Sequence, residues 1–204
     1  MVEKFIQDAL ILWATIDPIG TMAVFVSVTA GLSQQERQRA AVRTVFYAGM
    51  VLIGSIIIGQ ILLTAMGIRL ISLQLGGGII LFLFGLQMIF GASQQKLKED
   101  PDHDVAVFPL AIPGTATPGA ILAVILLTDN HIYSIPTQIG TAVITLSILG
   151  ITWLLLCFSE KILQIIGHAG ASILTKVMGM ILAALSVELV MNAIGVEQWL
   201  QSAI

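Results

Sequence analysis

Long apolar stretches separated by short polar ones make up almost the whole chain. A run of roughly 18 or more apolar residues with few charges is long enough to cross a bilayer as one helix. The pattern predicts six such spans, over residues 5–31, 41–66, 70–91, 105–128, 136–158 and 172–194. The predicted fold class is therefore an all-α membrane protein with six transmembrane helices.

The first predicted span is interrupted by the sequence Asp17-Pro18-Ile19-Gly20. Pro18 has no N–H, and its ring crowds the preceding turn of a helix. Asp is a favoured N-cap, proline is favoured at the next position, and Gly20 adds backbone freedom. We therefore expect two half-helices that meet near Asp17.

The fourth predicted span is interrupted in the same way by residues 113–119, Pro-Gly-Thr-Ala-Thr-Pro-Gly. Thr117 is a capping residue, and Pro118 follows it as Pro18 follows Asp17. Pro18 and Pro118 stand 100 residues apart, at corresponding positions of the two halves of the chain. Paired interrupted spans are the best indication of a transporter binding site that a sequence offers.

The composition agrees with a membrane protein, and the placement of the charged residues predicts its orientation in the membrane. The chain has 204 residues, of which 57% are hydrophobic and 10% charged, so it has no room for a separate soluble domain. One side of the six-span topology carries only Lys4 and Arg69, so the positive-inside rule places loops one, three and five in the cytoplasm and both termini outside. The basic residues on the cytoplasmic side are Arg37, Arg39, Arg43, Lys96, Lys98, Lys161 and Lys176.

The chain divides into two halves, residues 1–95 and 105–204, which resemble each other. Residues 96–104 join them, and we interpret this segment as an acidic cytoplasmic linker rather than a metal site. With a shift of 101 residues, Gly78-Ile79-Ile80-Leu81 aligns with Gly179-Met180-Ile181-Leu182. Because each half has three spans, an odd number, the second half must enter the membrane from the opposite side. The halves are therefore predicted to be inverted three-helix repeats, with the first and fourth helices broken at the Pro/Gly motifs.

Five motifs spread over essentially the whole chain carry a family resemblance. They lie at residues 17–20, 31–33, 76–82, 106–113 and 118–121. Together they resemble the MarC family of bacterial integral membrane proteins, which includes archaeal SnatA-type transporters of small neutral amino acids and is related to the LysE-type exporters. The resemblance implies a secondary transporter that moves glycine- or alanine-like amino acids across the inner membrane. Many relatives carry Asn at the positions of Asp17 and Thr21.

Helix physics suggests how the two interruptions would bind such a substrate. Half-helices that start at Pro18 and Pro118 direct free N–H groups and positive dipole ends into the membrane interior, where they bind a carboxylate. Carbonyl groups near Ile16 and Ile112 suit an ammonium group or a coupling cation, and the glycines leave room for a small substrate. The expected substrate-binding residues are Asp17, Pro18, Gly20, Thr21, Gly114, Thr115, Thr117, Pro118 and Gly119.

The alternative is that both motifs are proline kinks packed against neighbouring helices. The backbone groups that the kinks free would then be bonded to Ser or Thr side chains. We favour the binding site, because kinks rarely come in symmetric pairs that both carry caps.

Two carboxylates are candidates for coupling transport to a proton or a sodium ion. Glu188 lies in the middle of the last span, near Ser186 and Asn192, and an ionisable residue at that depth suggests a function. An equally good interpretation is that Glu188 makes a hydrogen bond that holds two helices together. Asp17 is the second candidate, although capping a half-helix would also explain it.

Other functions have less support in the sequence. No HExxH, GxSxG or P-loop pattern occurs, so we expect no enzyme, no cofactor, no metal and no nucleic-acid partner. The expected partners are a small neutral amino acid, a coupling proton or sodium ion and the lipid bilayer, and the oligomeric state is open. The alternatives are an exporter of other small metabolites or drugs, a passive channel, or a structural membrane protein.

Overall fold

The computed structural model describes residues 2–91 and 104–196 of the chain, and every regular element within them is helical. The predicted linker, residues 96–104, lies outside this part except for Asp104. The elements are α1 (Val2–Ile16), α2 (Pro18–Val28), α3 (Gln34–Ala65), α4 (Leu70–Phe90), η1 (Ala106–Thr115), α5 (Pro118–Leu127), α6 (Ile135–Cys157) and α7 (Ser159–Ile194).

These elements provide the number of membrane spans that the hydropathy pattern predicts. Residues 2–28, 34–65, 71–90, 135–157 and 169–194 are each long and apolar enough to cross a bilayer. The helices η1 and α5 form a sixth candidate span if they are counted together, because they pass the same test as a pair that is bent by 53°. The prediction of an all-helical, multi-pass membrane protein is therefore confirmed.

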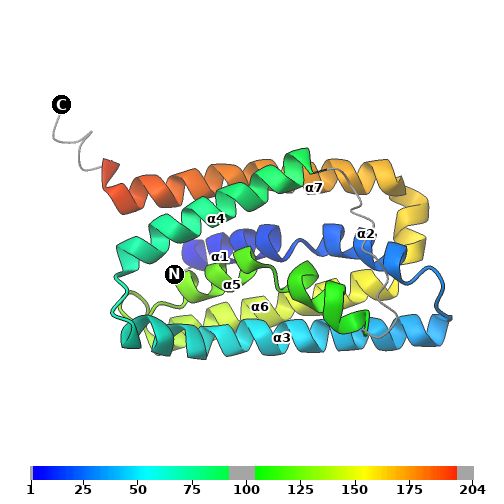
Figure 1. Ribbon diagram of the computed structural model, residues 1–204, viewed down its shortest axis with the longest axis horizontal. Helices are drawn as coiled ribbons and strands as arrows, with labels where there is room; N and C mark the ends of the chain where they lie inside the picture. Colours follow the sequence, from blue (N-terminus) through cyan, green and yellow to red (C-terminus); the bar gives the residue numbers. More distant parts are fainter. Residues whose placement is uncertain (1, 92–103, 197–204) are drawn as a thin grey trace.

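The helices are arranged in three layers (Figure 1). The α3–α6 pair lies along one side of the bundle and the α4–α7 pair along the other, with α1, α2, η1 and α5 between them. The α2–α3 and α6–α7 connections lie at one end, and the α3–α4 and α5–α6 connections lie at the opposite end. This layering places both Pro/Gly motifs in the centre of the molecule.

The packing of the described helices runs mainly between the two halves of the chain. The extensive contacts of α1, α2, α3 and α4 are all made with elements that follow residue 104. The largest contact joins α4 to α7, which run in opposite directions (Figure 1). The first half is therefore packed against the second half rather than against itself.

Small residues let α4 and α7 approach closely. A Cβ atom added at Gly85 would lie 2.9 Å from the carbonyl oxygen of Gly179, and one added at Gly179 would lie 2.7 Å from the Cβ of Met88. Farther along the same contact, a Cβ at Gly78 would lie 3.1 Å from the carbonyl oxygen of Ser186. Close backbone contact at glycines is how helices pack in lipid, where water provides no hydrophobic driving force between them.

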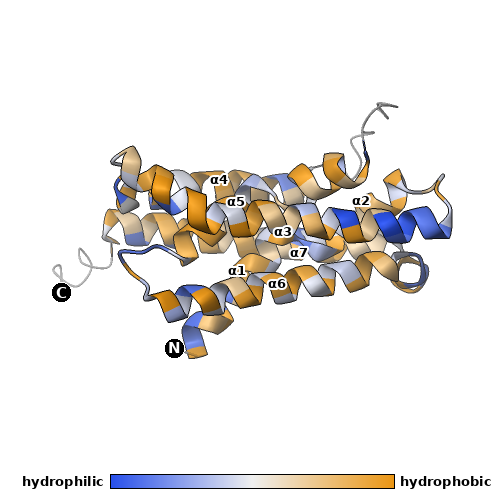
Figure 2. Ribbon diagram, turned by 90° about the horizontal axis from the view of Figure 1, so that it is seen from below, coloured by the Kyte–Doolittle hydropathy of each residue, from blue (hydrophilic) through white to orange (hydrophobic). Residues whose placement is uncertain are grey.

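The exterior of the bundle is apolar and part of the interior is polar, which is the distribution expected in lipid. Many large apolar side chains are exposed on the helices, and the most polar stretch is the start of α3 at one end of the bundle (Figure 2). Threonine is the commonest buried polar residue. Its hydroxyl can satisfy backbone groups that water cannot reach inside a membrane. The buried threonines are Thr15, Thr21, Thr29, Thr44, Thr115, Thr117, Thr128, Thr141, Thr145 and Thr152.

The last helix begins earlier than the predicted span at residues 172–194. Helix α7 starts at Ser159, and Gly167 interrupts it with φ 73° and ψ 163°. Glycine adopts such backbone angles without strain because it has no Cβ. The apolar membrane-spanning part starts only at Ala169, after this kink.

Candidate functional site

Helices α1 and α2 are separated by a single residue, Asp17, which caps α2 as its sequence pattern predicts. The Asp17 carboxylate accepts a hydrogen bond from the N–H of Gly20 at 3.0 Å. Its backbone has φ 47° and ψ 67°, and Asp17 is the only described residue other than glycine in the left-handed region. Asp and Asn tolerate this region better than other side chains do. Proline follows at the first position of α2, where its missing N–H costs no hydrogen bond.

Gly20 is required by the way the Asp17 side chain folds over the start of α2. A Cβ atom at Gly20 would lie 2.0 Å from the Oδ2 atom of Asp17. Any larger residue would therefore displace the carboxylate from the cap. The structure gives this glycine a role that the sequence did not suggest.

The second interruption lies between η1 and α5 and uses a threonine. Thr117 is extended, with φ −68° and ψ 156°, and its hydroxyl oxygen accepts a hydrogen bond from the N–H of Ala120 at 2.9 Å. In η1, Phe108 and Ile112 also have extended backbones, and each of them precedes a proline. Proline disfavours the helical conformation in the residue before it. The run of prolines thus explains why η1 is irregular and why α5 starts afresh.

The two interruptions contact each other directly through hydroxyl groups. Thr21 of α2 donates a hydrogen bond to the carbonyl oxygen of Gly114 at 3.1 Å. In the opposite sense, Thr117 donates to the carbonyl oxygen of Thr15 at 2.8 Å. Thr115 donates to the carbonyl oxygen of Leu110 at 2.9 Å. These bonds satisfy carbonyl groups near the interruptions, which is the arrangement that the kink alternative also expects.

Little space is left beside the glycines Gly114 and Gly119 at the second interruption. Space beside the glycines is occupied by protein atoms, because a Cβ at Gly114 would lie 2.7 Å from the carbonyl oxygen of Pro109 and one at Gly119 would lie 3.0 Å from Leu81. The structure thus brings the expected site residues together in one central region. Of these, Asp17, Pro18, Thr21, Thr115, Thr117 and Gly119 are buried, Gly20 and Gly114 are half-buried, and Pro118 is exposed.

Glu188, the other candidate for ion coupling, lies elsewhere. It is exposed on the outer surface of α7, where the side-chain amide of Asn192 donates to its carboxylate at 3.4 Å. The contact is the one-turn spacing that the sequence predicts. The structure does not bring Glu188 to the two interruptions.

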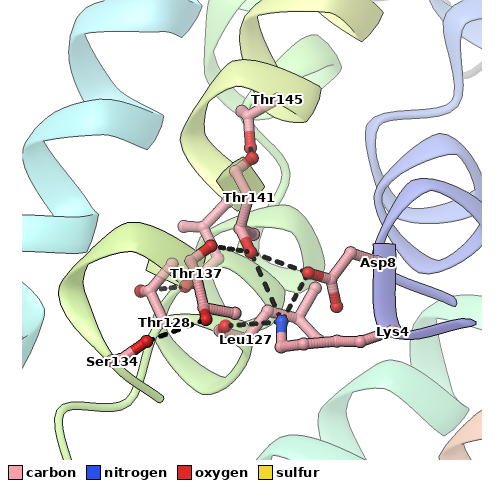
Figure 3. A network of polar contacts seen from close by, with 9 residues as sticks. Lys4, Asp8, Leu127, Thr128, Ser134, Thr137, Thr141 and Thr145 are labelled. Atoms are coloured by element: carbon pink, nitrogen blue, oxygen red, sulfur yellow. Dashed lines mark hydrogen bonds and ion pairs between the residues drawn. The ribbon is translucent and has the colours of Figure 1, made fainter. Parts of the chain in front are cut away.

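A further polar cluster was missed in the sequence. The Lys4 ammonium lies 2.5 Å from the Asp8 carboxylate, which is 1% exposed, and Thr141 of α6 donates to the same carboxylate at 2.7 Å (Figure 3). Two signals for this cluster were available. Lys4 and Asp8 are four residues apart, so they share a helix face, and Asp8 is an ionisable residue inside an apolar run.

Two cavities in the described part of the chain are lined by residues other than the expected site residues. One cavity lies between α4 and α7 and is lined by Gly78, Phe82, Ser186 and Val190 among others. Another lies near the α3–α4 and α5–α6 connections, beside Gln60, Arg69 and Asp129. Within residues 2–91 and 104–196, no group of three His, Cys, Asp or Glu residues is placed to hold a metal ion.

Comparison with known proteins identifies a matching family and related sequences. The sequence profile of the MarC family integral membrane proteins matches residues 2–198. A membrane protein of Methanocaldococcus jannaschii is 32% identical over 198 residues, which cover 94% of this chain and 96% of the relative. The inner membrane protein YhgN of Escherichia coli is 29% identical over 201 residues, covering 98% of this chain and 99% of the relative. No solved structure gives a significant match.

Proposed function

Because the chain belongs to the MarC family of integral membrane proteins, we propose that it is a secondary transporter of small neutral amino acids such as glycine and alanine. The observation that carries the proposal is the meeting of two capped half-helix starts in the centre of the bundle, at Asp17 and Thr117. Discontinuous helices whose N-terminal ends point at a substrate carboxylate are a recurring design of transporters.

An inverted repeat underlies this proposal, and the α4–α7 contact supports it. A Cβ at Gly78 would meet Ser186 and Val190, and a Cβ at Gly179 would meet Gly85 and Ile89. Adding 101 to 78 gives 179, and subtracting 101 from 186 and 190 gives 85 and 89. The two sets of contacts are therefore exchanged by a shift of 101 residues between antiparallel helices. Antiparallel packing alone gives such a symmetry of numbering, so the support lies in the glycines: Gly78 and Gly179, which are equivalent in this shift, both approach the partner helix closely, as an axis in the membrane plane would require.

The substrate binds between the starts of α2 and α5 in this proposal. Its carboxylate accepts hydrogen bonds from the first N–H groups of these helices, which have no partner within the helix. Its ammonium group lies near the carbonyl groups of Thr15 and Gly114 and near Asp17. Binding would displace the hydroxyls of Thr117 and Thr21 from those carbonyls. The bonds between the two interruptions thus close the site when it is empty.

The location and orientation follow from the charges and from the relatives. The relative from Escherichia coli is named as an inner membrane protein, and we assign this chain to the same kind of membrane. Loops one, three and five face the cytoplasm, because they and their flanks carry most of the basic residues. A reporter fused after residue 204 should therefore signal from outside the cytoplasm, and a cytoplasmic signal would reverse the orientation.

Counterflow in proteoliposomes tests the proposed function. Vesicles loaded with unlabelled alanine should take up labelled alanine faster than empty vesicles, because a carrier exchanges substrate and a channel does not. Gly119→Leu should abolish the exchange by filling the start of α5. Gly54→Leu in α3 is the matched control, because a Cβ at Gly54 has nothing within 4 Å. Both variants should insert and elute as the parent protein does.

Two outcomes would replace the proposal with an alternative. Uptake without acceleration by internal substrate would indicate a passive channel. Exchange of other small metabolites or drugs with no response to glycine or alanine would indicate an exporter of those compounds. The proposal includes no catalytic step and no cofactor.

A further inference from the structure

The ammonium group of Lys4 occupies a pocket of oxygen atoms (Figure 3). Lys4 belongs to the first turn of α1, which begins at the end of the bundle opposite the α2–α3 connection (Figure 1). It lies 2.5 Å from the Asp8 carboxylate, 3.3 Å from the carbonyl oxygen of Leu127 and 3.4 Å from the hydroxyl oxygen of Thr141. The ring of Tyr133 covers it, with 4.0 Å between the nitrogen and the ring centroid. A carboxylate, a carbonyl and a hydroxyl oxygen are ligands suited to a small monovalent cation.

The oxygen atoms of the pocket are buried, but the Lys4 side chain that fills it is partly exposed. Asp8 is 1% exposed and Thr141 is fully buried, whereas the Lys4 side chain is 18% exposed. A carboxylate buried in a membrane protein requires a cation or a proton to offset its charge. Lys4 supplies that charge on a flexible stem close to the start of the chain. It can swing out without moving the oxygen atoms, which come from α1, α5 and α6.

The pocket includes the end of the helix that starts at the central site. The last carbonyl groups of α5 accept side-chain hydrogen bonds, from Thr128 to Val124 at 2.5 Å, from Gln60 to Ile125 at 3.0 Å and from Lys4 to Leu127 at 3.3 Å. These carbonyls carry the negative end of the helix dipole, which favours a cation. Helix α5 has ten residues and starts at Pro118, so about 15 Å of rigid helix joins the pocket to the central site.

We propose that Asp8, the Leu127 carbonyl and Thr141 form the binding site of the coupling cation, a proton or a sodium ion, and that Lys4 occupies this site when the cation is absent. The inference rests on the proposed transport function. Cation binding releases Lys4 and changes the charge at the C-terminal end of α5, while the substrate binds at the N-terminal end of the same helix. Occupancy of the two sites is therefore coupled through one rigid element.

Besides Lys4 and Asp8, the titratable groups near the pocket are Tyr133 and Asp129, and the Asp129 carboxylate accepts a hydrogen bond from the N–H of His131 and faces its ring nitrogen Nδ1. Tyr133 and Asp129 come from the α5–α6 connection. Burial, and after it the negative charges of Asp8 and Asp129, raises the pKa of the Tyr133 hydroxyl above its ordinary value. Tyr133 thus stays neutral near pH 7 and acts on the cation through its ring face.

Variants of the pocket test whether its oxygen atoms, rather than neighbouring residues, bind the cation. Lys4→Met removes the tethered competitor and leaves the oxygen atoms in place. The double variant Lys4→Met with Asp8→Asn removes the carboxylate as well, and no unpaired charge is left behind. Thr141→Val removes the hydroxyl ligand. Thr145→Val is its matched control, because Thr145 is also buried on α6 but donates to the carbonyl oxygen of Thr141.

Uptake of labelled alanine into proteoliposomes is measured with an imposed sodium gradient at constant pH and, separately, with a pH gradient in sodium-free buffer. One of the two gradients should drive accumulation by the parent protein. Lys4→Met should lower the half-saturating cation concentration, and Thr141→Val should raise it about tenfold, as expected for one lost hydrogen bond to a charged group. Thr145→Val should match the parent. The double variant should lose accumulation, and its counterflow rate should no longer depend on the cation.

Accumulation by the double variant equal to that of Lys4→Met would overturn the proposal, and so would a parent protein that responds to neither gradient. Failure of counterflow in the parent would count against the transport function instead. The cation site is then judged from thermal unfolding of the detergent-solubilised protein in sodium, potassium and a pH series. The cation should stabilise Lys4→Met and not the double variant, and an equal response of both variants would exclude the site. If Lys4→Met does not fold, the Thr141 and Thr145 variants make the same comparison.

Discussion

Asp17 and Thr117 stand at equivalent positions before α2 and α5, yet they hold their helices differently. Each accepts a hydrogen bond from the N–H three residues on. Thr117 also donates to the carbonyl oxygen of Thr15, whereas an ionised Asp17 has no proton to donate. Asp17 in turn adopts a left-handed backbone, which a β-branched threonine avoids. A cap needs only an oxygen atom, so other requirements decide which side chain is used. Asp17 suits the left-handed backbone at the first interruption, and Thr117 provides a hydrogen bond to the Thr15 carbonyl at the second.

The largest expected difference between the two interruptions concerns their glycines. Gly20→Ala places a methyl group 2.0 Å from the Asp17 carboxylate and should force it out of the cap, at a cost of about 2–3 kcal/mol. The one tight contact of Gly119→Ala is with the flexible end of the Leu81 side chain, at 3.0 Å, so this variant should change stability little. Thermal unfolding in detergent measures both variants, with a drop of about 5–10 °C expected for Gly20→Ala. Equal midpoints would show that the two starts are held alike.

A smaller effect is expected where Thr117 bridges the two interruptions. Thr117→Val loses the cap of α5 and leaves the Thr15 carbonyl without its donor, which should cost about 2 kcal/mol. Thr117→Ser keeps the hydroxyl and is the control. The same unfolding measurement should rank serine near the parent and valine well below it. A valine variant as stable as the serine variant would mean that the bridge contributes nothing.

The smallest effect is expected at Asp17 itself. Asn offers the same capping oxygen and tolerates the left-handed region, so Asp17→Asn should cost less than about 0.5 kcal/mol. It should also retain most of the alanine exchange and any response to the cation gradient, because we place the cation at Asp8. Exchange and gradient-driven uptake of this variant are measured side by side. Loss of the gradient response alone would move the coupling role from Asp8 to Asp17.

The starts of α2 and α5 at Pro18 and Pro118 have causes that are local in the sequence. Pro18 and Pro118 remove backbone donors, and Asp17 and Thr117 precede them as caps, so two residues specify where each half-helix starts. The bonds from Thr21 to Gly114 and from Thr117 to Thr15 were not predictable. They depend on how elements about 100 residues apart pack together.

The ionisable residues also show that the sequence does not reveal contacts between distant elements. Hydropathy gives the depth of a residue in a span but not the face of the helix that it occupies. Glu188 therefore attracted attention in the sequence, although it is exposed on the outside of α7. Asp8 stands near the start of its span, where hydropathy does not distinguish a buried carboxylate from a solvated one, although its partner Lys4 is one turn away. The buried threonine and carbonyl partners of this pair come from α5 and α6, which no local pattern reveals.

The packing of the first half against the second half affects when the bundle can assemble during synthesis. Helices α1 to α4 leave the ribosome first, but their extensive contacts are with η1, α5, α6 and α7. The glycine face of α4 stays without its partner until α7, the last helix, has been synthesised. The first three spans must therefore wait in the bilayer as loosely associated helices, and the bundle assembles only after α7 has been synthesised. A nascent chain that stops after residue 91 should be a substrate for membrane quality control.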